Sequence, residues 1–208
     1  TLFWALPFAV GFVDLIFVHE MGHALVMRRL GLGSGAPVFI PFVGAVIAMK
    51  KQPQNAYIES LVGIGGPALG SVGALVCLLI AWATGSPFWY ALASTGFLIN
   101  LFNMIPISPL DGGRIVGVIS PWLWIIGYAI GIFVFFKIQS PILALILLLG
   151  LFQVRNAFKT RDSAYYQVPR GYREQMGVAY FGLVILLCVG MWAALHPLAS
   201  TNRTLGLS

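Results

Sequence analysis

Residues 2–30 read LFWALPFAVGFVDLIFVHEMGHALVMRRL, an apolar run that closes with a pair of arginines. A run of this length is sufficient to cross a bilayer as an α-helix. Residues 19–23 place two of the three histidines and one of the six acidic residues of the chain inside this apolar run. Ionisable groups inside a membrane helix are costly and mark functional sites. We therefore predict a membrane helix that carries a functional site.

The composition of the whole chain is that of a membrane protein. Of its 208 residues, 59% are hydrophobic and 9% are charged, whereas a soluble domain carries about 25% charged residues. Too few polar side chains remain to cover a water-facing surface, so the lipid bilayer is an expected partner. The net charge of +6 comes from basic residues in the gaps between apolar segments, and we predict no nucleic-acid partner.

Six apolar segments are candidate transmembrane helices. They cover about residues 2–30, 57–84, 88–105, 121–136, 141–154 and 177–195. Residues 33–49 are also apolar, but glycine and proline interrupt them and valine, isoleucine and phenylalanine dominate. The sequence predicts an all-α polytopic membrane protein with about six transmembrane helices and a short membrane-embedded β-strand or hairpin after the first helix. Such irregular backbone requires shelter by protein or a water-filled cavity.

The distribution of basic residues predicts an orientation. With six spans, ten of the twelve lysines and arginines lie on the side that follows the first helix, and only Lys137 and Arg203 lie on the other. Cytoplasmic loops carry such an excess. Residues 19–23 lie near this end of their helix, so we predict an integral multi-pass protein whose site is toward the cytoplasmic side.

The spacing of the two histidines predicts a metal site. On a helix, His19 and His23 lie one turn apart on one face, and Glu20 is placed to act as a general base toward a metal-bound water. A zinc site needs a third protein ligand. Asp111 is the best candidate, because prolines end the third span and glycines then permit a close approach. The alternatives are histidines bonded to neighbours and an Asp111 that caps the next helix.

Two patterns taken together resemble the site-2 protease family of intramembrane metalloproteases. The first is residues 19–23 on a membrane helix, and the second is Asn103-x-x-Pro106-x-x-Pro109-Leu110-Asp111-Gly112. Gly65-Gly66-Pro67 is similar to the glycine-proline element of the family, and residues 39–46 are similar to its membrane-associated strand. The likeness covers about residues 4–120. One departure is Gly70, where the family often has asparagine three residues after the proline.

The resemblance implies an intramembrane zinc metalloprotease that cleaves a transmembrane segment of a membrane protein in regulated intramembrane proteolysis. It implies Zn²⁺ held by His19, His23 and Asp111, with Glu20 as the catalytic base. Asn103 is a candidate for substrate or oxyanion support, and a helix-end cap is its alternative role. An unwound substrate segment is expected to add to the strand, which contains the residues Phe39, Ile40, Phe42 and Val43. The alternative role for this strand is a structural plug.

The extent of the family likeness divides the chain at residue 120. Residues 1–120 form the expected protease core, and residues 121–208 form the C-terminal transmembrane helices. We expect a single membrane domain with no appended soluble domain, and a regulatory membrane partner is an open expectation. Because the chain begins at Thr1 without methionine, we also expect residues to precede it.

Two rival classes fit parts of the pattern. The first is a catalytically silent zinc-binding membrane scaffold or chaperone of the same fold. Glu20 argues against it, because an inactive relative has no physical need for a carboxylate there. The second is a transporter, which would place polar residues along a path through several spans. Spans four to six are nearly free of such residues.

Overall fold

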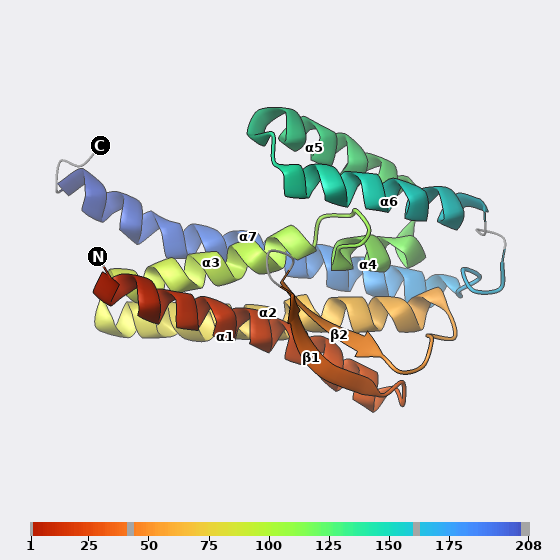
Figure 1. Ribbon diagram of the computed structural model, residues 1–208, viewed down its shortest axis with the longest axis horizontal. Helices are drawn as coiled ribbons and strands as arrows, with labels where there is room; N and C mark the ends of the chain where they lie inside the picture. The colour runs from red at the N-terminus through yellow and green to blue at the C-terminus, as the bar shows by residue number, and fades with distance from the viewer. Residues whose placement is uncertain (1, 41–43, 160–162, 205–208) are drawn as a thin grey trace.

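A computed structural model describes residues 2–40, 44–159 and 163–204 of the protein (Figure 1). Seven helices and two strands lie within these ranges. In chain order they are α1 (Leu2–Arg29), β1 (Ser34–Ile40), β2 (Gly44–Met49), α2 (Ala56–Thr84), α3 (Pro87–Asn103), α4 (Asp111–Ile119), α5 (Trp122–Ile138), α6 (Pro141–Lys159) and α7 (Arg170–Thr204). The mostly helical architecture and the hairpin after the first helix are confirmed.

Three of the helices are long and apolar enough to cross a membrane. They span Trp4–Arg29, Ala56–Thr84 and Arg170–Pro197. Two further apolar helices, Trp122–Ile138 and Pro141–Phe152, are shorter, and α3 has 17 residues. A helix coincides with each of the six predicted segments, while the count of six spans stays a prediction.

The helical core is built around α2. It packs against α1, α3, α4 and α7, and α3 packs against α7. Figure 1 shows α1, α2, α3 and α7 running side by side along the long axis. Phe97, Leu78, Leu92 and Ala74 are almost completely buried in this core. Burial of apolar side chains and close packing therefore hold together the four helices that surround the site.

Helices α5 and α6 form a separate antiparallel pair, of which α5 packs against α4 (Figure 1). Gly127 faces the loop before α4 so closely that a Cβ at this position would overlap the Pro106 carbonyl oxygen. Gly150 likewise meets the Ser108 carbonyl oxygen. The pair therefore covers the loop that joins α3 to α4.

Helical structure extends into residues 155–176, between the last two apolar segments. Helix α6 continues to Lys159, and α7 already begins at Arg170. Lysine and arginine are good helix formers, so a helix can continue past the end of its apolar segment. Figure 1 shows that the end of α6 and the start of α7 lie at the same end of the molecule as the end of α1 and the start of α2. The number of spans and the cytoplasmic location of this end stay predictions.

The strands β1 and β2 form an antiparallel hairpin beside α1. Val38 pairs with Val46, and Ile40 pairs with Gly44. Ile47 is buried against a cluster that includes Ala24 and Met27 of α1. The hairpin is therefore attached to the part of α1 that follows the second histidine.

Candidate metal centre

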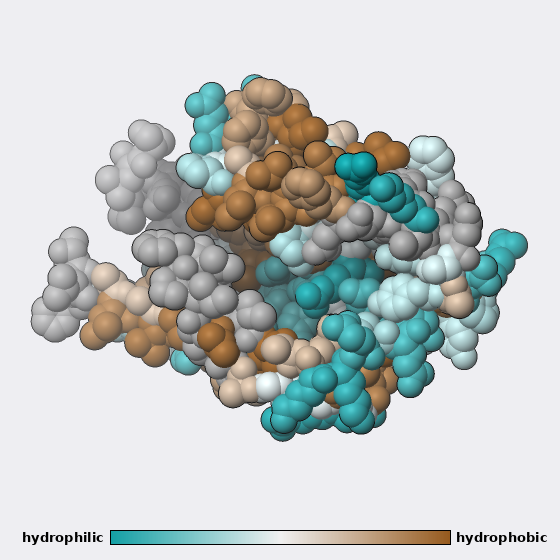
Figure 2. Space-filling view, turned by 45° about the vertical axis from the view of Figure 1, so that its right-hand side comes forward, coloured by the Kyte–Doolittle hydropathy of each residue, from teal (hydrophilic) through white to brown (hydrophobic). Residues whose placement is uncertain are grey.

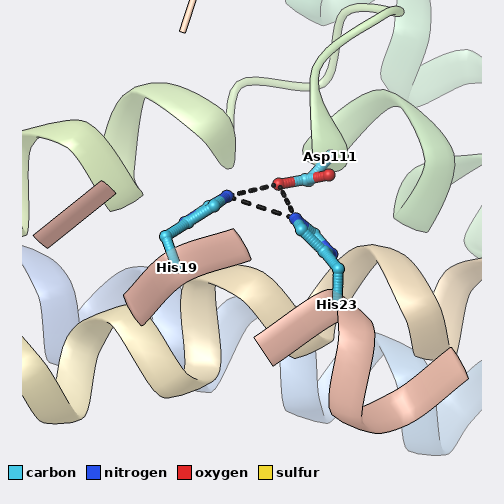
Figure 3. A group of neighbouring side chains, drawn as sticks. All are labelled: His19, His23 and Asp111. Carbon is cyan, nitrogen blue, oxygen red and sulfur yellow. Dashed lines mark hydrogen bonds and ion pairs between the residues drawn. The ribbon is translucent and has the colours of Figure 1, made fainter. Parts of the chain in front are cut away.

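Three side chains from two distant helices converge on one point (Figure 3). His19 and His23 project from α1, and Asp111 is the first residue of α4. His19 Nε2 lies 3.1 Å from Asp111 Oδ2, and His23 Nε2 lies 3.2 Å from the same oxygen. The two Nε2 atoms are 3.2 Å apart. All three residues are buried.

Glycines allow α2 to approach the histidines closely. A Cβ at Gly22 of α1 would overlap the Gly65 carbonyl oxygen of α2, so these two helices touch through their backbones. A Cβ at Gly66 would overlap His23 Nε2 and lie 2.8 Å from His19 Nε2. The glycine-proline element of the sequence therefore makes room for the two imidazoles.

The outer nitrogen of each imidazole has a fixed partner. His23 Nδ1 lies 2.7 Å from the Val62 carbonyl oxygen, which can only accept a hydrogen bond. His19 Nδ1 lies 2.8 Å from Asn100 Oδ1, and Asn100 Nδ2 donates to the Gly96 carbonyl oxygen at 2.7 Å. Both Nδ1 atoms are therefore donors, and both neutral imidazoles present the Nε2 lone pair to the centre.

The centre thus gathers three acceptors that bring no proton of their own. Two imidazole nitrogens and one carboxylate oxygen face one another, and only a cation placed among them satisfies all three. Their separations of 3.1 to 3.2 Å are close to the edge of about 3.3 Å expected for a tetrahedron with zinc–ligand distances of about 2.0–2.1 Å. The donor set and its spacing fit zinc, and His19, His23 and Asp111 form a possible metal-binding group.

Backbone geometry directs Asp111 toward the histidines. The residue that precedes α4 is Leu110, whose side chain makes no capping hydrogen bond, and Asp111 occupies the first helical position. A Cβ at Gly112 or Gly113 would overlap the backbone of residues 104–108. The start of α4 therefore folds tightly against the preceding loop, and the carboxylate points to the two imidazoles rather than capping its own helix.

Two hydrogen bonds from the C-terminal helices hold the backbone on either side of Asp111. Tyr180 Oη of α7 donates to the Met104 carbonyl oxygen at 2.6 Å. Trp124 Nε1 of α5 donates to the Gly113 carbonyl oxygen at 2.8 Å. The segment after residue 120 therefore positions Asp111, a contribution that no sequence motif in that segment indicates.

The electrostatic environment favours an ionised Asp111. Burial acts to raise the pKa of its carboxyl group, but when the imidazole Nε2 atoms carry protons in place of a metal, the positive charge on His23 and the hydrogen bonds from both imidazoles outweigh burial and hold this pKa well below its usual range. The carboxylate, which is the form that ligates a metal, therefore predominates at neutral pH.

Glu20 is buried beside the centre, and its carboxylate is not engaged by another described residue. It adjoins His19 on α1, and the charges that act on its carboxyl group include those of His23 and His19. Within residues 2–40, 44–159 and 163–204, Glu20 has no hydrogen-bond or ion-pair partner. Its carboxylate is therefore available to a water molecule or a substrate.

The remaining predicted residues lie around the centre in different ways. Asn103 is the last residue of α3, and its Nδ2 donates to the Ile99 carbonyl oxygen of the same helix at 3.0 Å. Phe39 and Ile40 lie in β1, where their backbones pair with Ala45 and Gly44. Phe42 and Val43 lie outside the described residues. The roles of these residues in substrate binding stay predictions.

Asn100 is the polar residue that the sequence analysis missed. It is almost completely buried and lies in the same predicted span as Asn103. Unlike Asn103, it belongs to no recognised motif. A polar amide inside an apolar segment is the sequence feature that could have identified Asn100. A Cβ at Gly70 would overlap Asn100 Oδ1. Asn100 therefore occupies the space beside position 70, where the site-2 protease family often has asparagine.

Replacing Asn100 by leucine is expected to lower zinc affinity about 10- to 100-fold, the usual cost of losing an outer partner of a ligating histidine. The imidazole of His19 would lose the acceptor that fixes its orientation and its tautomer. Competition with a fluorescent zinc chelator measures this change. The matched control is Asn103→Leu, an identical replacement three residues away, which is expected to leave zinc affinity unchanged. Equal losses in both variants would contradict a specific role for Asn100.

The chain is similar to proteins named as zinc metalloproteases. No family model matches the chain. Zinc metalloprotease MJ0392 of Methanocaldococcus jannaschii is 32% identical over 121 residues, which cover 56% of this chain and 34% of that protein. Rip3 of Mycobacterium tuberculosis, provisionally named a zinc metalloprotease, is 33% identical over 125 residues, which cover 56% of this chain and 30% of that protein. Rip2 of Mycolicibacterium smegmatis, also provisionally named a zinc metalloprotease, is 28% identical over 147 residues, which cover 54% of this chain and 56% of that protein.

The chain spans about a third of the length of the first two of these relatives. Their names agree with the donor set at the centre, and zinc is the metal that both indicate. The chain is therefore a homologue of curated zinc metalloproteases, in agreement with its sequence resemblance to the site-2 protease family.

Proposed function

We propose that this protein is an intramembrane zinc metalloendopeptidase that hydrolyses a peptide bond in a transmembrane segment of a membrane-protein substrate during regulated intramembrane proteolysis. The observation that carries the proposal is a centre of three ligands, two of them on the apolar helix α1, beside the Glu20 carboxylate, which has no hydrogen-bond or ion-pair partner among the described residues. Three protein ligands leave a position for water or substrate, as in catalytic zinc sites. A purely structural zinc site is usually closed by four protein ligands.

The chemistry divides between the metal and Glu20. When bound, zinc supplies Lewis acidity that activates water and polarises the scissile carbonyl. Glu20 accepts the proton of the attacking water and passes it to the leaving amine when the C–N bond breaks. His19, His23 and Asp111 hold the metal, and Asn100 keeps the His19 imidazole oriented.

The hairpin is suited to present an unwound substrate to the centre. A peptide bond in a transmembrane helix is protected by helical hydrogen bonds, so the substrate must unwind before it can be cleaved. An unwound segment can add to the edge of a strand. The hairpin packs on α1 next to Ala24, one residue after His23, and Val38 of β1 is exposed. Strand addition at this edge would place the substrate beside the metal ligands.

Replacing Val38 by proline is expected to reduce cleavage at least about tenfold while zinc stays bound. Proline removes a backbone N–H and fixes φ, which disfavours both the hairpin and its extension by a substrate strand. Cleavage and zinc content are measured on the same preparations. Val38→Thr, which keeps the N–H and the β-branched shape, is the matched control and is expected to retain activity. Loss of zinc in Val38→Pro would indicate that the hairpin is a structural plug.

Access for water is also part of the proposal. Figure 2 shows a hollow between the upper pair of helices, α5 and α6, and the rest of the molecule, with hydrophilic residues inside it. Hydrolysis consumes water, and this hollow offers a route to it. His23 and His19 lie about 8 and 14 Å along α1 from Arg28, so we place the site within the bilayer near its cytoplasmic face.

The position of the cut tests the proposal. The full chain would be reconstituted in lipid vesicles with a single-span substrate, and mass spectrometry of the products would locate the cleaved bond. We expect a cut within the apolar span of the substrate, in the half nearer the cytoplasmic side. Cuts confined to soluble regions would contradict intramembrane proteolysis. Bound zinc with no cleavage across several substrates would favour the catalytically silent scaffold.

A further inference from the structure

Asp14 is an ionisable residue that the metal centre does not use. It lies on α1 five residues before His19, about 7.5 Å farther from the cytoplasmic end. From Leu2 it is about 18 Å along the helix, and from Arg29 it is about 22 Å. The carboxyl group is therefore near the middle of the span. Its side chain is exposed, and it has no hydrogen-bond or ion-pair partner in the described part of the chain.

Asp14 lies in a groove that three helices form on the outside of the bundle. The groove has a volume of about 430 Å³. Its lining residues come from α1, α2 and α3 and include Pro7, Val10, Asp14, Gly73, Val76 and Trp89. Asp14 is the one acidic residue in an otherwise largely apolar lining, while Val10 and Val76 are about half exposed. Asp14 is therefore a single acidic residue in a groove that is otherwise suited to apolar contact.

A carboxyl group in this position needs a partner. Ionisable residues at the bilayer centre face a protein interior or a water-filled cavity, and they pair with other polar groups. The groove extends along α1 from Pro7 to Val18, which is about 16 Å or three helical turns. In the hydrocarbon region a helix satisfies its own backbone hydrogen bonds, so a helix is the natural occupant of such a groove.

The partner is not supplied by the chain itself. A second copy would have to offer a basic residue near the middle of a span. Apart from Arg28 and Arg29 at the end of the first segment, the six apolar segments contain no lysine or arginine. Charge complementarity to Asp14 therefore points to a different protein.

We propose that the groove around Asp14 binds a transmembrane helix of another membrane protein that carries lysine or arginine near the middle of its span. The cation pairs with the Asp14 carboxylate, and apolar side chains of the same helix pack on Val10 and Val76. The pair removes both charges from lipid and fixes the depth of the bound helix. This interaction does not depend on hydrolysis.

The test measures the association of model helices with the full chain in phosphatidylcholine vesicles. One helix carries lysine at its midpoint, and the other is identical with leucine there. Glu20→Gln is used as the background so that cleavage cannot remove a bound helix. Energy transfer between labelled partners is expected to show about 3- to 20-fold tighter binding of the lysine helix, the range set by polar contacts between membrane helices. Asp14→Leu is expected to abolish this preference while bound zinc is retained.

Charge reversal and crosslinking make the test specific. Asp14→Lys is expected to prefer a helix with glutamate at its midpoint. With Cys77 and Cys188 replaced by alanine, Val10→Cys is expected to crosslink to a cysteine one turn from the lysine of the helix. Ile185→Cys, at an exposed mid-span position of α7, is expected not to. Equal binding of the lysine and leucine helices, equal crosslinking at both positions, or preferential crosslinking of Val10→Cys chains to each other would overturn the proposal.

Discussion

Replacing Asp111 by alanine is expected to lower zinc affinity by more than about 100-fold, beyond the 10- to 100-fold cost of losing an outer partner. The variant keeps two imidazoles but loses the oxygen that both of them face at 3.1 and 3.2 Å. Two histidines from one helix cannot complete a site that requires three protein ligands. Equilibrium dialysis against a zinc buffer, followed by elemental analysis, measures the change.

Asp14→Ala is the matched control for Asp111→Ala. It removes a second carboxyl group that lies near the membrane interior but takes no part in the three-residue group. We expect it to bind zinc as the unmodified protein does. Equal zinc affinity in the two variants would contradict the role of Asp111 as a ligand and would return it to a purely structural role at the start of α4.

Replacing Glu20 by glutamine is expected to reduce cleavage about 10²- to 10⁴-fold, the usual contribution of a general acid–base group. Glutamine has nearly the same shape but cannot accept the proton of the attacking water. Because Glu20 is not among the three residues that converge on the metal position, bound zinc is expected to remain. The rate of cleavage of a model transmembrane substrate and the zinc content are measured on the same preparation.

Glu59→Gln is the matched control for Glu20→Gln. Glu59 lies in the first turn of α2 and accepts a hydrogen bond from Tyr165, away from the metal centre. An identical change there is expected to leave cleavage within about twofold, since it removes no group that acts on the water or the leaving amine. Retained cleavage in Glu20→Gln would show that another group is the base, and a loss of zinc in that variant would show that Glu20 supports the metal site.

The sequence was sufficient to predict the inner part of the centre. His19 and His23 share one helix, so helix geometry alone sets their common face. Asp111 required one further step, because prolines and glycines had to return the chain from α3 to α1. The structure brings all three side chains together. These positions depend on helix periodicity and on the effects of proline and glycine on the backbone, which can be read from the sequence alone.

Contacts across helices could not be predicted in the same way. Asn100 reaches His19 only because Gly70 leaves room for its side chain, and no spacing rule relates residues 70 and 100. Tyr180 bonds to the backbone before Asp111 and Trp124 to the backbone after it, both from helices without a recognised motif. Asn103 belongs to the recognised motif, yet its amide bonds to its own helix. Packing between distant segments decides such contacts, and packing depends on the whole fold.

The measurement that tests the central claim most directly is the dependence of cleavage on zinc occupancy in the purified full chain. Metal would be removed with a chelator and returned in steps, and bound zinc and cleavage of a transmembrane substrate would be measured at each step. We predict that activity is lost with the metal and returns in proportion to occupancy, reaching its maximum at about one zinc per chain, as one three-ligand site requires. Cleavage that persists in the metal-free protein would contradict the account.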